Sequence, residues 1–268
     1  MPGSLLLVGA GKMGSALVDG WLAQGIAATD LHVVEPGAGA RQAMSARGIA
    51  ASAAAAELSD GFAPTTIVFA VKPQSMDEVV PAYARHATQA LYISIAAGKP
   101  IAFFERHLGR SAALVRVMPN TPAAVGRGIS VLTANARVTP AQRAHAETLL
   151  AAVGETAWIE DEGLMDAVTA LSGSGPAYVF LLVECMARAG VAAGLDPDLA
   201  MQLARATVAG SGELLRQSHE DATTLRQNVT SPGGTTEAAL KVLMGAGGLE
   251  SLMEKAIRAA RDRSRELA

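Results

Sequence analysis

The sequence has little cysteine, few aromatic residues and no block of basic residues, and each of these shortages argues against a class of protein. Its 268 residues include one cysteine, so no disulfide can form within the chain. Aromatic residues make up only 4% of the chain, and this scarcity beside abundant alanine favours packed helices over an all-β sandwich. The formal net charge is −3 and no block of basic residues occurs, which argues against nucleic acid or an anionic membrane as a partner.

Several site signatures are also missing. The five histidines are scattered and none has ligand spacing with a cysteine or a carboxylate, so we predict no metal site. No Gly-x-Ser-x-Gly elbow lies on a strand–helix turn, because Gly173-Ser174-Gly175 lies among predicted helices. Cys185 lies in an apolar helical stretch and is expected to be buried rather than to act as a nucleophile. Any chemistry is therefore expected to come from a bound cofactor.

The hydropathy pattern gives no sign of a membrane protein. No uncharged segment reaches transmembrane length. No cationic leader precedes a cleavage site, because the first apolar run is already a predicted strand. We therefore expect a soluble, cytoplasmic protein.

The chain begins with a glycine-rich pattern. An apolar run, 5–8, predicts a buried strand, and a helix is predicted to end near Ala23. Between them, Gly9 permits a tight turn, Gly11 lets a pyrophosphate approach the backbone, and Gly14 lets the helix lie close to the strand. The N-terminus of such a helix offers unpaired N–H groups to phosphates. This strand–turn–helix order is typical of dinucleotide binding, whereas the glycines alone could form an ordinary turn.

Short apolar runs alternate with helical segments up to about residue 160. Further strands are predicted at 31–35, 65–71, 90–96, 112–118, 128–133 and 155–159. Helices are predicted at 40–47, 53–58, 74–87, after Pro100, and from Thr139, where a capping box and Pro140 open a helix that runs to Gly154. This alternation predicts an α/β domain with a parallel sheet covered by helices on both faces.

The rest of the chain predicts helices only. We therefore divide it into an α/β domain, 1–162, and an all-α domain, 163–268. The predicted helix 176–193 has only Glu184 and Arg188 as charged residues, and a helix apolar around most of its circumference must be buried on most sides. Because so few helices cannot supply that cover within one chain, we predict an intimate homodimer through this domain.

Three loops follow predicted strands at the sheet edge where open parallel sheets bind ligands. Lys72 could approach a cofactor there, or Pro73 could simply end the strand. The small residues 96–98 suit a flat ligand ring and a tight turn equally well. Asn120 and Thr121 lie between two prolines, and this stiff polar loop favours a functional role over a mere turn.

The segment 231–236 is the most informative part of the helical half. A proline and two glycines interrupt the helical pattern, and a new helix begins near Thr235. Successive N–H groups in such a loop, beside a helix N-terminus, form a carboxylate or phosphate site. Hydroxyls of Ser231, Thr235 and Thr236 lie beside it. The alternative is an ordinary cap, with Thr235 capping the helix and Glu237 supporting it.

Five motifs, taken together, resemble one family. In order they are Gly9-Ala10-Gly11-Lys12-Met13-Gly14, Ala70-Val71-Lys72-Pro73-Gln74, Met118-Pro119-Asn120-Thr121-Pro122, Leu171-Ser172-Gly173-Ser174-Gly175-Pro176-Ala177-Tyr178-Val179-Phe180 and Ser231-Pro232-Gly233-Gly234-Thr235-Thr236. The sequence resembles pyrroline-5-carboxylate reductases over essentially its whole length. The last two motifs carry the resemblance most specifically, because the N-terminal glycines occur in many families.

The resemblance implies an N-terminal Rossmann domain and a C-terminal dimerisation domain. It also implies an active site where the cofactor domain of one subunit meets the helical domain of its partner, and homodimers that can assemble into decamers, as pentamers of dimers. The implied reaction reduces the cyclic imine L-1-pyrroline-5-carboxylate to L-proline, the last step of proline biosynthesis, with NADP(H) or NAD(H).

The resemblance also assigns residues. Thr236 is the hydroxyl near the ring nitrogen and the candidate catalytic residue, although a threonine is a poor acid unaided. The implied substrate-binding residues are Ser231, Gly233, Gly234, Thr235 and Thr236. The implied cofactor-binding residues are Val8, Gly9, Ala10, Gly11, Lys12, Met13, Gly14, Ala70, Val71, Lys72, Pro73, Ile95, Ala96, Ala97 and Asn228.

Two positions depart from the family pattern. Glu35 ends the second predicted strand about twenty residues beyond the glycines, where an acid binds the adenosine ribose 2′-OH and disfavours a 2′-phosphate. Many family members carry small polar or basic residues there, so the choice between NADPH and NADH stays open, and Arg41 lies near enough in sequence to affect it. Asp221-Ala222 replaces a common His-Pro, and we expect only a local loop change.

Two other functions compete with this interpretation. A β-hydroxyacid dehydrogenase shares the two-domain layout, but it needs a lysine early in the helical domain, and no lysine occurs between Lys99 and Lys241. A non-catalytic NAD(P)-binding regulator would not need the hydroxyl-rich loop.

Overall fold

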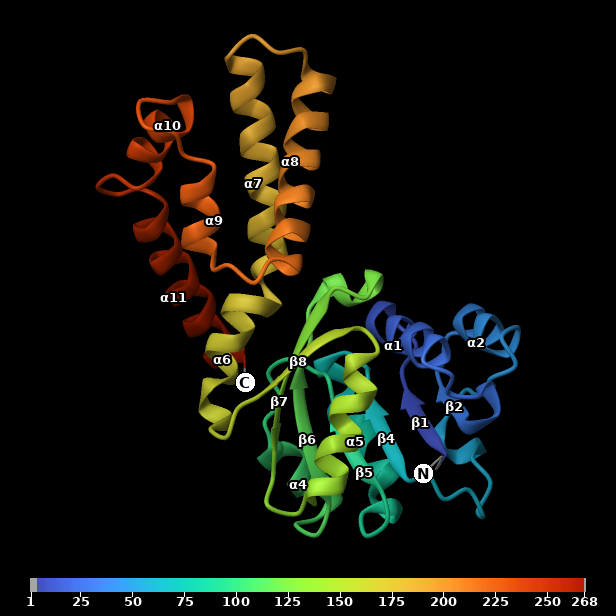
Figure 1. Ribbon diagram of the computed structural model, residues 1–268. Coiled ribbons are helices and arrows are strands. Elements are labelled where there is room, and N and C mark those ends of the chain that lie inside the picture. The colour runs from blue at the N-terminus through green and yellow to red at the C-terminus, as the bar shows by residue number, and fades with distance from the viewer. Residues whose placement is uncertain (1–3, 268) are drawn as a thin grey trace. The chain divides into compact units, whose positions relative to one another are not determined.

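The computed structural model describes residues 4–267 and forms two compact units (Figure 1). The first contains the chain up to Gly173 and again from Arg261, and the second is Ser174–Ala260. The boundary that we draw at residue 162 from the sequence does not coincide with this division, because the first short helices after it pack with the first unit.

The first unit is built on one eight-stranded sheet with the order β3-β2-β1-β4-β5-β6-β7-β8. Its strands are β1 (Leu5–Val8), β2 (Leu31–Val34), β3 (Ala50–Ser52), β4 (Thr66–Phe69), β5 (Leu91–Ser94), β6 (Ala113–Met118), β7 (Gly128–Ala134) and β8 (Gly154–Trp158). Seven of these correspond to predicted strands. The edge strand β3 was not predicted, because it is only three residues long and made of alanine and serine.

The prediction of a wholly parallel sheet is wrong at one pair. β6 and β7 are antiparallel, whereas every other pair of neighbouring strands is parallel. The connection between them, from Met118 to Gly128, is too short for the crossover of a dozen or more residues that parallel strands need. The chain therefore turns back beside the strand that it has just left.

Helices cover both faces of this sheet (Figure 1). Those of the first unit are α1 (Lys12–Ala23), α2 (Ala38–Ser45), α3 (Met76–Val79), α4 (Ile101–Leu108), α5 (Pro140–Ala151) and α6 (Met165–Val168). The predicted capping box at Thr139 and Gln142 is confirmed. The single helix predicted at 74–87 is wrong: α3 lies between two 3₁₀ segments, and Pro81 removes a backbone donor where the second begins.

Alternate residues of β1 enter two separate cores. Leu5 and Leu7 pack in a cluster that includes Trp21, whereas Leu6 and Val8 pack in a cluster that includes Phe69. A strand that is buried on both faces is continuously apolar, which is why the first strand is so easily predicted.

The second unit is helical throughout. It contains α7 (Gly175–Ala192), α8 (Pro197–Gln217), α9 (Ala222–Asn228), α10 (Thr235–Leu243) and α11 (Leu249–Leu267), of which the last turns belong to the first unit. No strand follows β8 within residues 4–267, so the prediction of helices only is confirmed. α7 and α8 lie side by side (Figure 1).

Much of the apolar surface of α7 and α8 is exposed in the single chain. Phe180 is 63% exposed, and the exposed large side chains on these two helices also include Val179, Leu181, Leu182, Met186, Val191, Leu199, Met201, Leu203, Leu214 and Leu215. Cys185 is exposed as well, so its predicted burial does not occur within one chain. The sequence supplies an apolar surface here that one chain leaves uncovered.

One stretch, Glu162–Ala192, is long and apolar enough to cross a membrane by length and composition alone. It contains Glu184 and Arg188, which form an ion pair, and is therefore not uncharged. A π-helical turn, Thr169–Gly173, interrupts it before α7.

Three histidines of the first unit should make the protein less stable in acid. Burial lowers the pKa of His32, His86 and His145 below the ordinary value of 6.5, so the folded state holds them neutral. The unfolded chain binds more protons below pH 6.5, so the stability that they contribute is complete above that pH and is lost as the pH falls. The pKa of Asp77 is lowered from its ordinary value of 3.8, mainly by its hydrogen bond to Lys99, so this group affects stability only at a pH well below that of the histidines.

We expect the free energy of unfolding, measured by urea titration, to decrease between about pH 7.5 and about pH 5.5. His86→Gln should reduce the slope of this dependence, because a glutamine does not titrate. An equal slope in the variant and the wild type would contradict the role of His86.

Candidate active site

Two glycines of the turn after β1 have no room for a side chain. Gly9 has φ +97°, and a Cβ there would lie 2.8 Å from Val71 Cγ1 and 2.9 Å from the carbonyl oxygen of Ala70. A Cβ on Gly14 would overlap the carbonyl oxygen of Gly9. The close approach of α1 to β1 and β4 therefore requires glycine at both positions, as the sequence predicts.

Gly11 is glycine for a different reason. No atom of residues 4–267 lies within 4 Å of the Cβ that it would carry, and its φ of −68° and ψ of −170° are open to any residue. It is the N-cap of α1, and no side chain caps that helix. An open backbone face at an uncapped helix N-terminus matches the cradle that a dinucleotide pyrophosphate requires.

Glu35 lies directly beside this turn. Its Oε2 accepts a hydrogen bond of 2.8 Å from the N–H of Ala10, and its Oε1 accepts one of 2.8 Å from the N–H of Gly37. Arg41 Nη1 donates to the carbonyl oxygens of Glu35, at 2.9 Å, and Pro36, at 2.6 Å. The fold thus directs the carboxylate toward the glycine turn and the guanidinium toward backbone carbonyls.

The other predicted cofactor loops of the first unit join this edge. β1 lies between β2 and β4, and β5 follows β4. Hydrogen bonds extend the pairing just past the strand ends, from Ala70 N–H to the Val8 carbonyl at 2.8 Å and from Ile95 N–H to the Phe69 carbonyl at 3.1 Å. The sheet therefore brings 8–14, Glu35, 70–73 and 95–97 to the carboxyl ends of neighbouring parallel strands.

Lys72 and Asn120 differ in how free their side chains are. Lys72 is exposed and precedes the 3₁₀ turn that Pro73 begins. A contact of Lys72 with the cofactor and a simple end of the strand at Pro73 therefore both stay open. Asn120 Oδ1 accepts from the N–H of Ile129 at 2.9 Å, and its Nδ2 donates to the carbonyl of Ser172 at 3.3 Å. These bonds give Asn120 a structural role in holding its loop.

The loop 231–236 lies in the second unit and precedes α10. Its cap is Gly234 rather than the expected Thr235, which is the first residue of the helix. Glu237 Oε2 accepts from the N–H of Gly233 at 2.8 Å, so this carboxylate already satisfies one of the loop donors. Within residues 4–267, the hydroxyls of Ser231, Thr235 and Thr236 have no hydrogen-bond partner and are available to a ligand.

Asn228 is the last residue of α9 in the same unit. Its Nδ2 donates to Glu220 Oε2 at 3.1 Å. Its contact with a cofactor stays a prediction. The local loop change expected at Asp221-Ala222 also stays a prediction; Asp221 is the N-cap of α9 and accepts from the N–H of Thr224.

Comparison with known proteins shows the family of this chain. Residues 162–267 match the family model described as pyrroline-5-carboxylate reductase dimerisation, and residues 4–98 match that described as NADP oxidoreductase, coenzyme F420-dependent. The sequence is 43% identical to a pyrroline-5-carboxylate reductase of Pseudomonas aeruginosa over 98% of this chain and 96% of that protein. The chain belongs to the pyrroline-5-carboxylate reductase family.

Solved structures of this reductase family have the same fold. A pyrroline-5-carboxylate reductase of Coxiella burnetii matches with a TM-score of 0.94 and 33% identity, covering 100% of this chain and 99% of that one. The Plasmodium falciparum reductase with NADP bound matches with a TM-score of 0.83 and 31% identity, over 99% and 98% of the two chains. The predicted Rossmann-type α/β domain followed by a helical dimerisation domain is confirmed.

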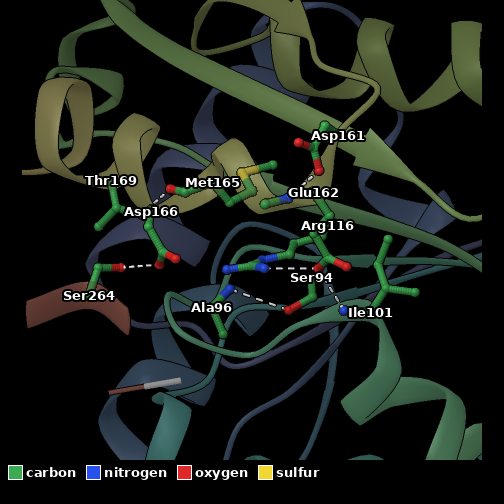
Figure 2. Close-up of polar contacts among 11 residues, drawn as sticks. Ser94, Ala96, Ile101, Arg116, Asp161, Glu162, Met165, Asp166, Thr169 and Ser264 are labelled. Carbon is green, nitrogen blue, oxygen red and sulfur yellow. Dashed lines mark hydrogen bonds and ion pairs between the residues drawn. The ribbon is translucent and has the colours of Figure 1, made fainter. Parts of the chain in front are cut away.

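A polar cluster in the first unit of this reductase was not predicted from the sequence (Figure 2). Arg116 Nη1 in β6 lies 2.8 Å from Glu162 Oε1, and the same oxygen accepts from the N–H of Ile101 at 2.8 Å. Nearby, Ser264 of α11 donates to Asp166 Oδ1 of α6 at 2.7 Å. The only sequence signal for the first group is an arginine inside a strand that is otherwise apolar.

Proposed function

We propose that this member of the pyrroline-5-carboxylate reductase family reduces L-1-pyrroline-5-carboxylate to L-proline with NADPH or NADH, the last step of proline biosynthesis. The observation that carries the proposal is the 43% identity to the reductase of Pseudomonas aeruginosa over 98% of this chain. The hydroxyl-bearing loop before α10 supports it, because a purely regulatory NAD(P)-binding protein would not need that loop.

The first unit holds the cofactor in this proposal. Its glycine turn, Val8 to Gly14, binds the pyrophosphate through the open face at Gly11 and the uncapped N-terminus of α1. The proposed flanking contacts of this unit come from residues 70–73, 95–97 and Glu35, and the family resemblance adds Asn228 of the second unit. When bound, NADPH or NADH would supply the hydride to the carbon of the C=N bond, whose nitrogen is already protonated and charged, so that the electron pair of the double bond becomes the lone pair of the proline nitrogen.

The loop 231–236 binds the substrate. The carboxylate of the substrate lies against Gly233 and Gly234 and is held by Ser231 and Thr235, where the positive end of the α10 dipole favours an anion. The hydroxyl of Thr236 hydrogen-bonds the ring nitrogen and holds the imine in the orientation that reduction requires.

A direct assay tests this function. The purified protein is mixed with L-1-pyrroline-5-carboxylate and NADPH or NADH, and the absorbance of the reduced nicotinamide is followed. Proline formation with loss of that absorbance supports the reductase. Binding of the dinucleotide without oxidation of either form would instead favour a regulator, and turnover of a β-hydroxyacid would favour the dehydrogenase.

Glu35 sets the choice of dinucleotide in this proposal. A carboxylate at the end of β2 accepts a bond from a ribose 2′-OH and repels a 2′-phosphate. Glu35→Ser should therefore raise the ratio of kcat/KM for NADPH to kcat/KM for NADH by at least about fivefold. Glu57→Ser is the control, because its carboxylate binds only the backbone N–H of Ala53. A ratio unchanged by Glu35→Ser would refute this role.

We also infer a cytoplasmic homodimer through the second unit. The exposed apolar side chains of α7 and α8 lie within the region that matches the dimerisation family model, so a partner subunit rather than lipid is the proposed cover. Resemblance to the family suggests further assembly into a pentamer of dimers. Light scattering without detergent measures the molar mass in solution and so tests both the dimer and the pentamer of dimers. A monomer in solution would contradict the dimer.

A further inference from the structure

Helix α4 has no cap of its own. It begins at Ile101, and the preceding residue, Pro100, carries no side-chain oxygen. The carboxylate of Glu162, 61 residues later in the chain, accepts the hydrogen bond of the Ile101 N–H at 2.8 Å. A carboxylate at this position satisfies an orphan donor and opposes the positive end of the helix dipole. Glu162 is therefore a remote cap for α4 (Figure 2).

Arg116 holds this remote cap in place. It lies in β6 opposite Ser94 of β5, and its side chain is only 9% exposed. A guanidinium buried to this extent needs a paired charge, and Glu162 Oε1 lies 2.8 Å from its Nη1. The carboxylate is thus bound from two sides, by the sheet and by the helix.

Two hydrogen bonds and a glycine turn constrain the segment between β5 and α4. Near its start, the N–H of Ala96 donates to Ser94 Oγ at 3.3 Å. In its middle, Gly98 turns with φ +72°, and a Cβ there would lie 3.3 Å from the carbonyl oxygen of Leu267 in the last turn of α11. At its end, Glu162 binds Ile101. Of the two hydrogen bonds, only that to Glu162 has a charged acceptor.

We propose that Glu162 and Arg116 are positioning residues that hold the 95–100 segment in the geometry that binds the reduced dinucleotide. This inference rests on the proposed cofactor contacts of residues 95–97. If the cap is lost, the first turn of α4 frays and the segment before it moves. Only a fraction of the protein molecules then has this segment in the geometry that binds the cofactor, so the apparent Kd of the cofactor rises.

The test measures the Kd of NADPH and NADH by the fluorescence of the bound reduced nicotinamide, together with Tm. Glu162→Ala should raise the Kd of the preferred dinucleotide by at least about fivefold, while the KM for L-1-pyrroline-5-carboxylate changes by less than about twofold. Glu160→Gln is the matched control, because Glu160 pairs with Arg143 on the surface and its side chain is 84% exposed. It should leave the Kd unchanged.

A double variant separates positioning from stability. Arg116→Met with Glu162→Leu replaces a partly buried ion pair by apolar side chains. Such a replacement is often neutral or stabilising for buried pairs, so the Tm of the double variant should approach that of the wild type. Its Kd should stay raised, because leucine cannot accept the Ile101 hydrogen bond. A Kd restored together with Tm would overturn the proposal and leave the pair a purely structural role.

Ala97→Val tests the underlying cofactor site separately, by adding bulk within the segment. If this variant raises the Kd and Glu162→Ala does not, the positioning role fails and the cofactor site stands. If neither variant changes the Kd, residues 95–97 do not contact the dinucleotide and both proposals about this segment fail.

Discussion

Gly11→Ala should leave the protein folded and raise the Kd of the reduced dinucleotide at least about tenfold, equivalent to about 1.4 kcal/mol of binding free energy. The backbone at Gly11 accepts alanine, because its φ of −68° is ordinary and no atom in the described part of the chain lies within 4 Å of the added Cβ. The new methyl group would occupy the space that the pyrophosphate needs. Fluorescence titration gives the Kd. The free energy of unfolding, measured by urea titration, should change by less than about 1 kcal/mol.

Gly14→Ala is the informative companion. Here the added Cβ overlaps the carbonyl oxygen of Gly9, so the backbone must shift in the free protein itself. We expect a loss of at least about 2 kcal/mol in the free energy of unfolding. Equal losses of unfolding free energy in the two variants would contradict the different roles that we give to Gly14, which packs α1 against the turn, and Gly11, which leaves room for the pyrophosphate.

The strands of the cofactor domain were predictable because buried parallel strands are continuous apolar runs. The strand 66–69, for example, is buried throughout and bounded by turn residues. β3 lies at the sheet edge and contains no large apolar residue, so local sequence gave no signal for it. The direction of β7 did have a signal, since the connection from Met118 to Gly128 is too short for a parallel crossover.

The contacts within the candidate site were predictable only where its geometry is local. The roles of Gly9 and Gly14 follow from a pattern within one turn, and the structure gives each the steric reason expected of it. The bond of Glu35 to the N–H of Ala10 joins the loops that follow β2 and β1, and the pair of Arg116 with Glu162 joins β6 to a segment 46 residues away. Neither contact leaves a periodic pattern, because side-chain contacts across a fold have no fixed spacing in sequence.

The position of the cap before α10 has a functional consequence. With Gly234 as the N-cap and Glu237 bonded to the N–H of Gly233 in the preceding loop, no side chain caps α10, and the threonine hydroxyls take no part in capping it. Thr235 is thus free of the capping role that the cap interpretation gave it, and the hydroxyl of Thr236 has no hydrogen-bond partner within residues 4–267. Their replacement can test chemistry with little loss of stability.

Thr236→Ala should lower kcat for L-1-pyrroline-5-carboxylate by about tenfold to a hundredfold, since a hydrogen bond to a charged group contributes about 1.5 to 3 kcal/mol. The Kd of the reduced dinucleotide should change by less than about twofold, because the proposed contact of Thr236 is with the imine nitrogen and not with the cofactor. Steady-state kinetics and fluorescence titration measure the two quantities.

Thr236→Ser and Thr223→Ala complete this experiment. Serine keeps a hydroxyl and should recover most of kcat, which a role limited to packing by the threonine methyl group would not allow. Thr223 is an exposed threonine on α9, and its replacement should change neither quantity. If Thr236→Ala weakens dinucleotide binding as much as it lowers kcat, the loop is structural, and the group that holds the imine lies elsewhere.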